Sequence, residues 1–111
     1  MDQALAIVLT AVSSDEEAES LSDILIKSKY VACINILTNI KSKYIWKGKL
    51  QSVNEVILII KTKRDYFKYL EKIIKKNHSY QVPEIACIDI TDVSTEYGNW
   101  IINDLSMRED K

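Results

Sequence analysis

The chain is poor in residues that break regular structure: its 111 residues include two glycines and one proline. Few positions can therefore turn tightly, and we expect long helices and strands. No apolar run approaches the roughly 20 residues of a membrane-spanning helix, so no membrane association is predicted. The net charge of −1 provides no basic field, so no nucleic-acid partner is predicted. Asp2 stands where a signal peptide would be basic, which favours a cytoplasmic location.

Chemistry-bearing motifs are also scarce. There is one histidine, and the two cysteines, Cys33 and Cys87, sit far apart in apolar strand-like runs, as buried free thiols do. The chain has no nucleophile elbow, no phosphate-binding glycine loop and no paired-histidine metal motif. We therefore predict that the protein is not an enzyme.

The hydrophobic pattern predicts six elements of a compact unit followed by one more helix. We expect a strand at 4–11, a helix at 15–28, strands at 30–46 and 50–61, a helix at 62–76 and a strand at 83–91. The final helix is expected to begin at Ser94 or Thr95. This order predicts a single α+β domain over 1–111 with the ferredoxin-like βαββαβ sandwich, an extended hairpin and a C-terminal helix. The first and third strands are then central, and the second and fourth lie at the edges.

The second and third strands are unusually long. Each has roughly 12–16 residues, or about 40–50 Å, whereas a compact domain of this size has a radius of gyration of about 13 Å. The hairpin, which turns at Trp46–Lys49, should therefore project from the domain with apolar side chains exposed along it: Ile40, Tyr44, Ile45, Trp46 and Leu50. We expect a homo-oligomer that covers them; the alternative is a bent hairpin folded onto its own core.

One segment gathers the chain's only histidine and only proline: His78-Ser79-Tyr80-Gln81-Val82-Pro83-Glu84. It connects a Lys-rich helical pattern to an apolar strand pattern. An imidazole, a phenol, an amide and a carboxylate so close together on a loop are typical of a binding site.

Several motifs together resemble the CutA divalent-cation tolerance proteins. The similarities run over about 5–103. The family's motifs, in chain order, are "AACVN", "SxYxWxGK", "ExxLxxKT", "HPYExPEI" and "YxxWI". The residues that resemble them, in the same order, are 30–36, 42–49, 55–62, 78–85 and 97–101. The resemblance implies a homotrimer of ferredoxin-like subunits, similar in architecture to the PII signalling proteins. It also implies a role in tolerance to copper and other divalent cations, and animal members have been linked to acetylcholinesterase anchoring, so a protein partner is possible.

Two departures from the family weaken the metal prediction. The proline that usually follows the histidine is Ser79 here, so we expect a more mobile loop. Where copper has been proposed, the ligands are a cysteine and two adjacent histidines, and the matching residues here are Leu9, Asn77 and His78. His78 is thus the remaining candidate ligand for copper or another divalent cation. The alternative is an imidazole at a helix end, hydrogen-bonded to backbone.

Other polar residues define a second candidate site. A cleft between subunits is predicted to involve Glu55, Lys61, Tyr80, Gln81 and Glu84, and to hold an anionic or amphoteric small ligand; the alternative is structural ion pairing. Aromatic residues predicted to pack in the trimer are Tyr44, Trp46 and Trp100. Two functions remain open: divalent-cation tolerance with weak copper binding, or a PII-like signalling trimer that binds a metabolite.

Overall fold

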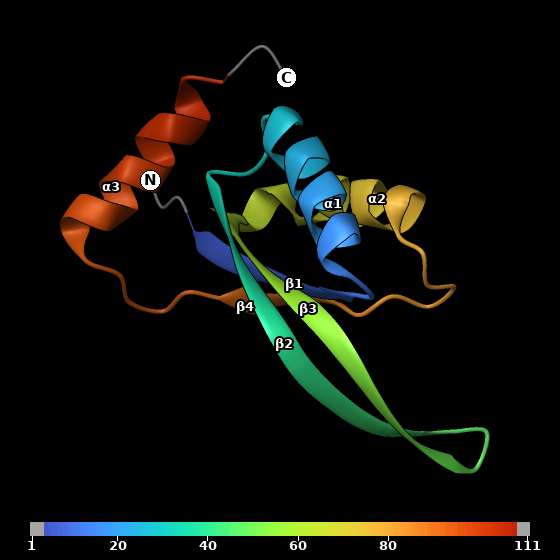
Figure 1. The fold of residues 1–111 in the computed structure, drawn as a ribbon. Helices are drawn as coiled ribbons and strands as arrows, with labels where there is room; N and C mark the ends of the chain where they lie inside the picture. Colours follow the sequence, from blue (N-terminus) through green and yellow to red (C-terminus); the bar gives the residue numbers. More distant parts are fainter. Residues whose placement is uncertain (1–3, 109–111) are drawn as a thin grey trace.

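The computed structural model describes residues 4–108 and contains one four-stranded antiparallel sheet with three α-helices and a short 3₁₀ turn (Figure 1). The elements in chain order are β1 Leu5–Val12, α1 Asp15–Lys27, β2 Cys33–Trp46, β3 Lys49–Lys63, the 3₁₀ turn Arg64–Tyr66, α2 Phe67–Asn77, β4 Ile85–Asp89 and α3 Thr95–Ser106. The predicted ferredoxin-like βαββαβ order with an added C-terminal helix is confirmed.

The strands lie in the order β2-β3-β1-β4, so β1 and β3 are central and the other two form the edges, as predicted. Helices α1 and α2 cover one face of the sheet, where Leu21, Leu25, Leu58 and Ile74 belong to a fully buried core. Helix α3 packs separately at one end of the sheet, in a second cluster that includes Leu5, Ala32, Ile101 and Leu105. The opposite end of the molecule is formed by the hairpin alone.

The β2–β3 hairpin projects beyond the rest of the domain, as expected (Figure 1). Its strands have 14 and 15 residues, and the molecule measures 48 × 27 × 22 Å along its principal axes. At the tip, Lys47 (φ 51°) and Gly48 (φ 79°) both have positive φ, which matches the tight turns that suit the twist of a hairpin. Ile45 and Leu50 near the tip are 65% and 70% exposed, so the bent-hairpin alternative does not apply to the subunit.

A β-bulge divides the hairpin into two parts. The pairing of β2 with β3 shifts between Leu37 and Ile40, and Asn39 in the bulge has φ 59°. Asparagine tolerates this left-handed conformation better than most residues. The sequence changes at this point from a continuous apolar run to polar–apolar alternation, so the bulge separates the part in the main sheet from the projecting part.

Several predicted boundaries are wrong. The second strand begins at Cys33 rather than at residue 30. The last strand spans Ile85–Asp89 rather than 83–91, because its pairing with β1 runs only from Thr10 to Ala6. The second helix begins at Phe67 rather than at Thr62, after the 3₁₀ turn. Thr62 belongs to β3 instead, where its buried hydroxyl donates a hydrogen bond to the Tyr30 carbonyl oxygen over 2.6 Å.

Candidate functional site

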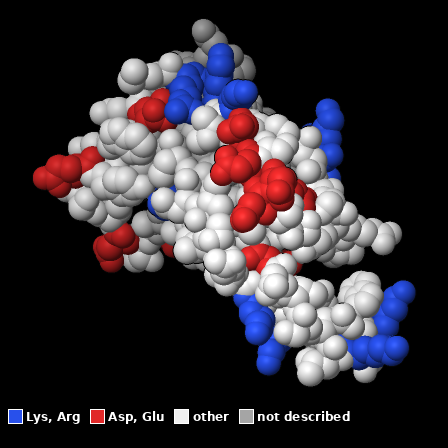
Figure 2. All heavy atoms as spheres, in the orientation of Figure 1, with Lys and Arg blue, Asp and Glu red and all other residues white. Residues whose placement is uncertain are grey.

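A cleft of about 760 Å³ lies between the projecting hairpin and the segment that connects α2 to β4. Figure 2 shows it from outside as a notch between the hairpin and the body of the molecule. It brings together four of the five residues predicted for a binding cleft, and two of the predicted packing aromatics. The lining residues are Ala11, Ser42, Lys43, Tyr44, Trp46, Gln51, Glu55, Tyr80, Gln81, Val82 and Glu84.

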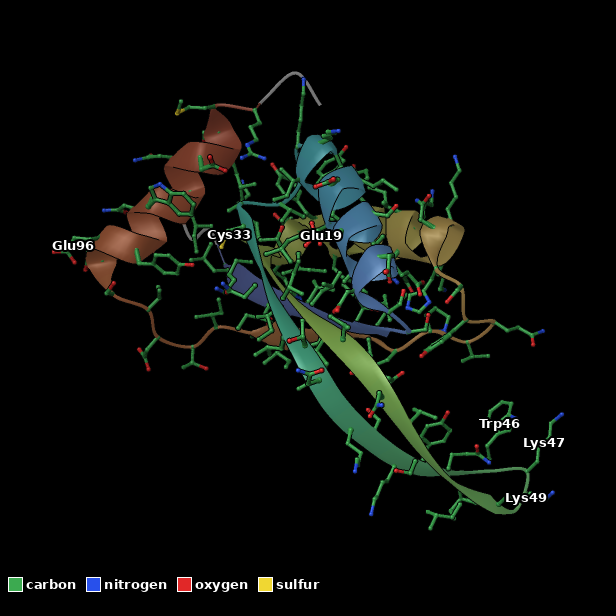
Figure 3. The ribbon with its side chains drawn as sticks, in the orientation of Figure 1. Glu19, Cys33, Trp46, Lys47, Lys49 and Glu96 are labelled. Carbon is green, nitrogen blue, oxygen red and sulfur yellow. The ribbon has the colours of Figure 1, made fainter. Side chains whose placement is uncertain are left out.

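The hairpin contributes one of its two faces to this cleft. Opposite residues of an antiparallel pair share a face, and the register pairs Ile40 with Glu55, Tyr44 with Gln51 and Trp46 with Lys49. Successive side chains alternate between faces, so Lys43 points to the other face from Tyr44. Figure 3 shows Trp46 at the hairpin end, on the side of the α2–β4 connection.

The cleft floor carries a buried carboxylate. Glu55 is only 8% exposed, and the Tyr80 hydroxyl donates a hydrogen bond to its Oε2 over 2.7 Å. Burial raises the pKa of Tyr80, and the hydrogen bond to Glu55 raises it further, so the phenol remains a protonated donor. Among residues 4–108, no other donor reaches the Glu55 carboxylate within the structure's hydrogen-bond distances.

Glu17, in the first turn of α1, holds the connection that borders the cleft. The Ser14 hydroxyl accepts from the Glu17 N–H and so caps the start of α1. The Glu17 carboxylate, however, accepts from the N–H and hydroxyl groups of both Ser13 and Ser79 over 2.8–3.1 Å. Ser79, expected to loosen the connection in place of a proline, instead supplies two bonds that attach it to α1.

These hydrogen bonds determine the direction in which the pKa of Glu17 shifts. Burial by itself raises the pKa of a carboxyl group, but the hydrogen bonds from the Ser79 backbone and from Ser13 outweigh it and lower the pKa of Glu17 to about 2. The carboxylate is therefore charged throughout the neutral range and holds the cleft connection in place.

His78 has protein partners on both ring nitrogens. Its side chain is fully buried; Nε2 lies 2.8 Å from the Ala11 carbonyl oxygen, and Nδ1 accepts from the Tyr80 N–H over 3.1 Å. This is the arrangement of the backbone-bonded alternative, in which both ring nitrogens contact backbone groups. Within residues 4–108, no group of three or more His, Cys, Asp or Glu side chains is placed to hold a metal ion. Metal binding by His78 remains an untested prediction.

Lys61 lies outside this cleft in the subunit. Its ammonium group donates to Asn35 Oδ1 and lies 3.5 Å from the Tyr97 hydroxyl and 3.9 Å from Cys33 Sγ. The hydrogen bond with Cys33, followed by burial, raises the pKa of Tyr97 to about 12. Within one subunit Lys61 thus belongs to a different cluster, and its place in an intersubunit cleft stays a prediction.

Trp100 borders that second cluster. Its ring stacks on that of Tyr97, with the centroids 6.0 Å apart and the planes at 9°. Cys33 and Cys87 are both partly exposed rather than buried as expected. Trp100, Tyr44 and Trp46 are about half exposed in the subunit, and their role in trimer packing remains a prediction.

No helix within residues 4–108 has the length and apolar character needed to cross a membrane.

Comparisons with known proteins agree with one another. The family model described as CutA1 divalent ion tolerance protein matches residues 6–104. The chain is 37% identical over 97 residues to the chloroplastic protein CutA of Arabidopsis thaliana, covering 87% of this chain and 53% of that protein. It is 36% identical over 100 residues to the divalent-cation tolerance protein CutA of Pyrococcus horikoshii, covering 90% and 97%.

The fold agrees as well. The crystal structure of CutA1 from Oryza sativa superimposes with a TM-score of 0.88 at 35% identity, covering 91% of this chain and 93% of that one. This chain thus spans about half the length of the Arabidopsis relative and nearly all of the Pyrococcus relative. The chain belongs to the CutA1 divalent ion tolerance protein family.

Proposed function

We propose that the protein acts in tolerance to divalent cations as a non-enzymatic, cytoplasmic homotrimer. The observation that carries the proposal is the family match over residues 6–104, nearly the whole chain. The two free cysteines fit a reducing compartment. Copper, if it binds, is bound weakly, because a metal at His78 would have to displace at least one of the two hydrogen bonds of the buried imidazole ring.

Expression of this chain should restore growth in elevated copper to a bacterial strain that lacks its own member of the family. A His78→Gln variant should restore growth equally, because the proposal assigns His78 a structural role. Circular dichroism of the purified variant controls for loss of the fold. No rescue by the folded wild-type chain would contradict the proposed function, and loss of rescue in a folded His78→Gln variant would assign the imidazole a direct role in the metal response.

The homotrimer is supported by what the subunit leaves uncovered. Ile45 and Leu50 are 65% and 70% exposed on the hairpin, and Ile88 and Trp100 are nearly half exposed. Strands β2 and β4 also leave open sheet edges, which favour pairing with other chains. A closed trimer would cover apolar surface and edges together.

Light scattering of the purified chain should give three times the 12.8 kDa mass of the polypeptide. Ile45→Glu combined with Leu50→Glu should shift the mass toward that of one chain, because two charges would then be buried at the proposed interface. A matched Glu16→Lys and Glu19→Lys variant on exposed positions of α1 should stay trimeric. A wild-type mass of 12.8 kDa at working concentration would disprove the trimer.

A further inference from the structure

The cleft between the hairpin and the α2–β4 connection has the electrostatic character of a site for cations. Its lining contains two carboxylates, Glu55 and Glu84, and one basic residue, Lys43, whose side chain points to the other face of the hairpin. Among residues 4–108, neither carboxylate takes part in an ion pair closer than 4.0 Å. Glu55 is 8% exposed and accepts one hydrogen bond, from Tyr80, so an ammonium group that reached its carboxylate would make a charge-assisted hydrogen bond in a partly enclosed place.

The walls of the same cleft are aromatic. Tyr44 and Trp46 line it from the hairpin, 46% and 56% exposed, and Tyr80 lines it from the opposite side. The faces of such rings attract ammonium groups, and most strongly in the case of tryptophan. The Trp46 ring already has a cationic neighbour, since the Lys47 ammonium lies 6.0 Å from its centroid.

Other classes of ligand fit less well. A metal ion would need several converging ligands, and residues 4–108 offer no group of three suitable side chains. An inorganic or carboxylate anion would meet two carboxylates, Glu55 and Glu84, and among the lining residues one cation, Lys43. The volume of about 760 Å³ lies within the range of small-molecule pockets, so it is far larger than a bare ion requires.

We propose that this cleft binds a small organic cation, an ammonium group on an apolar or aromatic body. The ammonium group pairs with Glu55, whose second oxygen is not engaged by Tyr80, and the apolar body lies against Tyr44 and Trp46. This replaces the anionic or amphoteric ligand expected from the sequence, because Lys61, the cation of that prediction, lies in another cluster. The proposal is independent of divalent-cation tolerance, and a neighbouring subunit in a trimer would border the open side of the cleft.

The test is a titration of the full chain with 2-phenylethylammonium, followed by the amide signals of Tyr44, Trp46 and Glu55 in ¹H–¹⁵N spectra. Saturable shifts confined to the cleft are expected. The neutral analogue 2-phenylethanol and the anion phenylacetate, which have similar bodies, should bind at least about tenfold more weakly. Equal binding of 2-phenylethanol would reduce the site to an apolar groove, and tighter binding of phenylacetate would reverse the assigned charge; either result overturns the proposal.

Glu55→Gln is the decisive variant, because the amide oxygen can still accept the Tyr80 hydrogen bond while the charge is lost. Its affinity for 2-phenylethylammonium should fall at least about tenfold. Glu19→Gln removes the same charge from an exposed position on α1, outside the cleft, and should leave the affinity unchanged (Figure 3). If Glu55→Gln does not fold, Trp46→Ala on the exposed hairpin provides the test, with at least threefold weaker binding expected. Unchanged affinity in the folded variant overturns the proposal.

Discussion

Replacing Glu17 with glutamine should lower the free energy of unfolding at pH 7 by about 3 kcal/mol. The folded protein lowers the pKa of this carboxyl from 4.5 to about 2, and each unit of pKa is equivalent to about 1.4 kcal/mol. Glutamine has no charge and presents an N–H₂ group where Ser13 and Ser79 both donate, so at least one of these contacts is lost. Urea denaturation at fixed protein concentration measures the difference.

The effect of this substitution should depend on pH in a defined direction. Because the folded-state pKa is below the unfolded one, the stabilisation is complete above about pH 4.5 and is lost as the pH falls toward 2. The difference between wild type and Glu17→Gln should therefore shrink across this window. Glu19→Gln, on an exposed position of the same helix, should differ from wild type by less than about 0.5 kcal/mol at pH 7. An identical pH slope in wild type and Glu17→Gln would contradict the assigned role.

The Glu17→Gln substitution should also loosen the connection between α2 and β4, which borders the cleft. Ser79 donates both of its described hydrogen bonds to the Glu17 carboxylate, and the following residue, Tyr80, donates to Glu55. The helix cap, the connection and the cleft floor are therefore parts of one hydrogen-bonded network, in which His78 joins the connection to Ala11 at the end of β1.

The fold could be predicted from local patterns because each element carries its own signal. Ser14 and Ser94 mark the two capped helices, and Gly48 marks the hairpin turn; the structure has all three features. Strand length also predicted the projection of the hairpin, since strands of 14 and 15 residues exceed what the domain can cover. The wrong boundaries lie where a pairing partner determines the length of an element. Strand β4 ends where its pairing with β1 stops, and no local sequence pattern indicates that point.

The site was harder to predict, because its members depend on the register and on a bulge. Sequence motifs identified Glu55, Tyr80, Gln81 and Glu84, and the structure brings them into one cleft. The same motifs added Lys61, which is six residues from Glu55 on β3 and faces the α3 end of the sheet. Glu17 was missed as a site residue, since a Ser-x-x-Glu pattern predicts a local cap and carries no sign of a partner at Ser79, 62 residues away.

Replacing Leu58 with alanine should lower the free energy of unfolding by about 2–5 kcal/mol, a large part of the 5–15 kcal/mol typical of a domain. Leu58 is fully buried on central strand β3, between Ile36 of β2 and Thr10 of β1, and belongs to the core beneath α1 and α2. A smaller side chain there leaves a cavity that neighbours in two strands and two helices cannot close without disturbing the sheet.

The matched control is Met107→Ala, which shortens a side chain that is 85% exposed at the end of α3 and should change the stability by no more than about 0.5 kcal/mol. Both variants are compared with wild type by urea denaturation at one protein concentration, because association would otherwise shift the apparent stability. A cost below about 1 kcal/mol for Leu58→Ala would mean that the core under α1 and α2 is loosely packed. In that case the two helices could not hold Glu17 and His78 rigidly against the connection, and the geometry of the cleft would lose its structural basis.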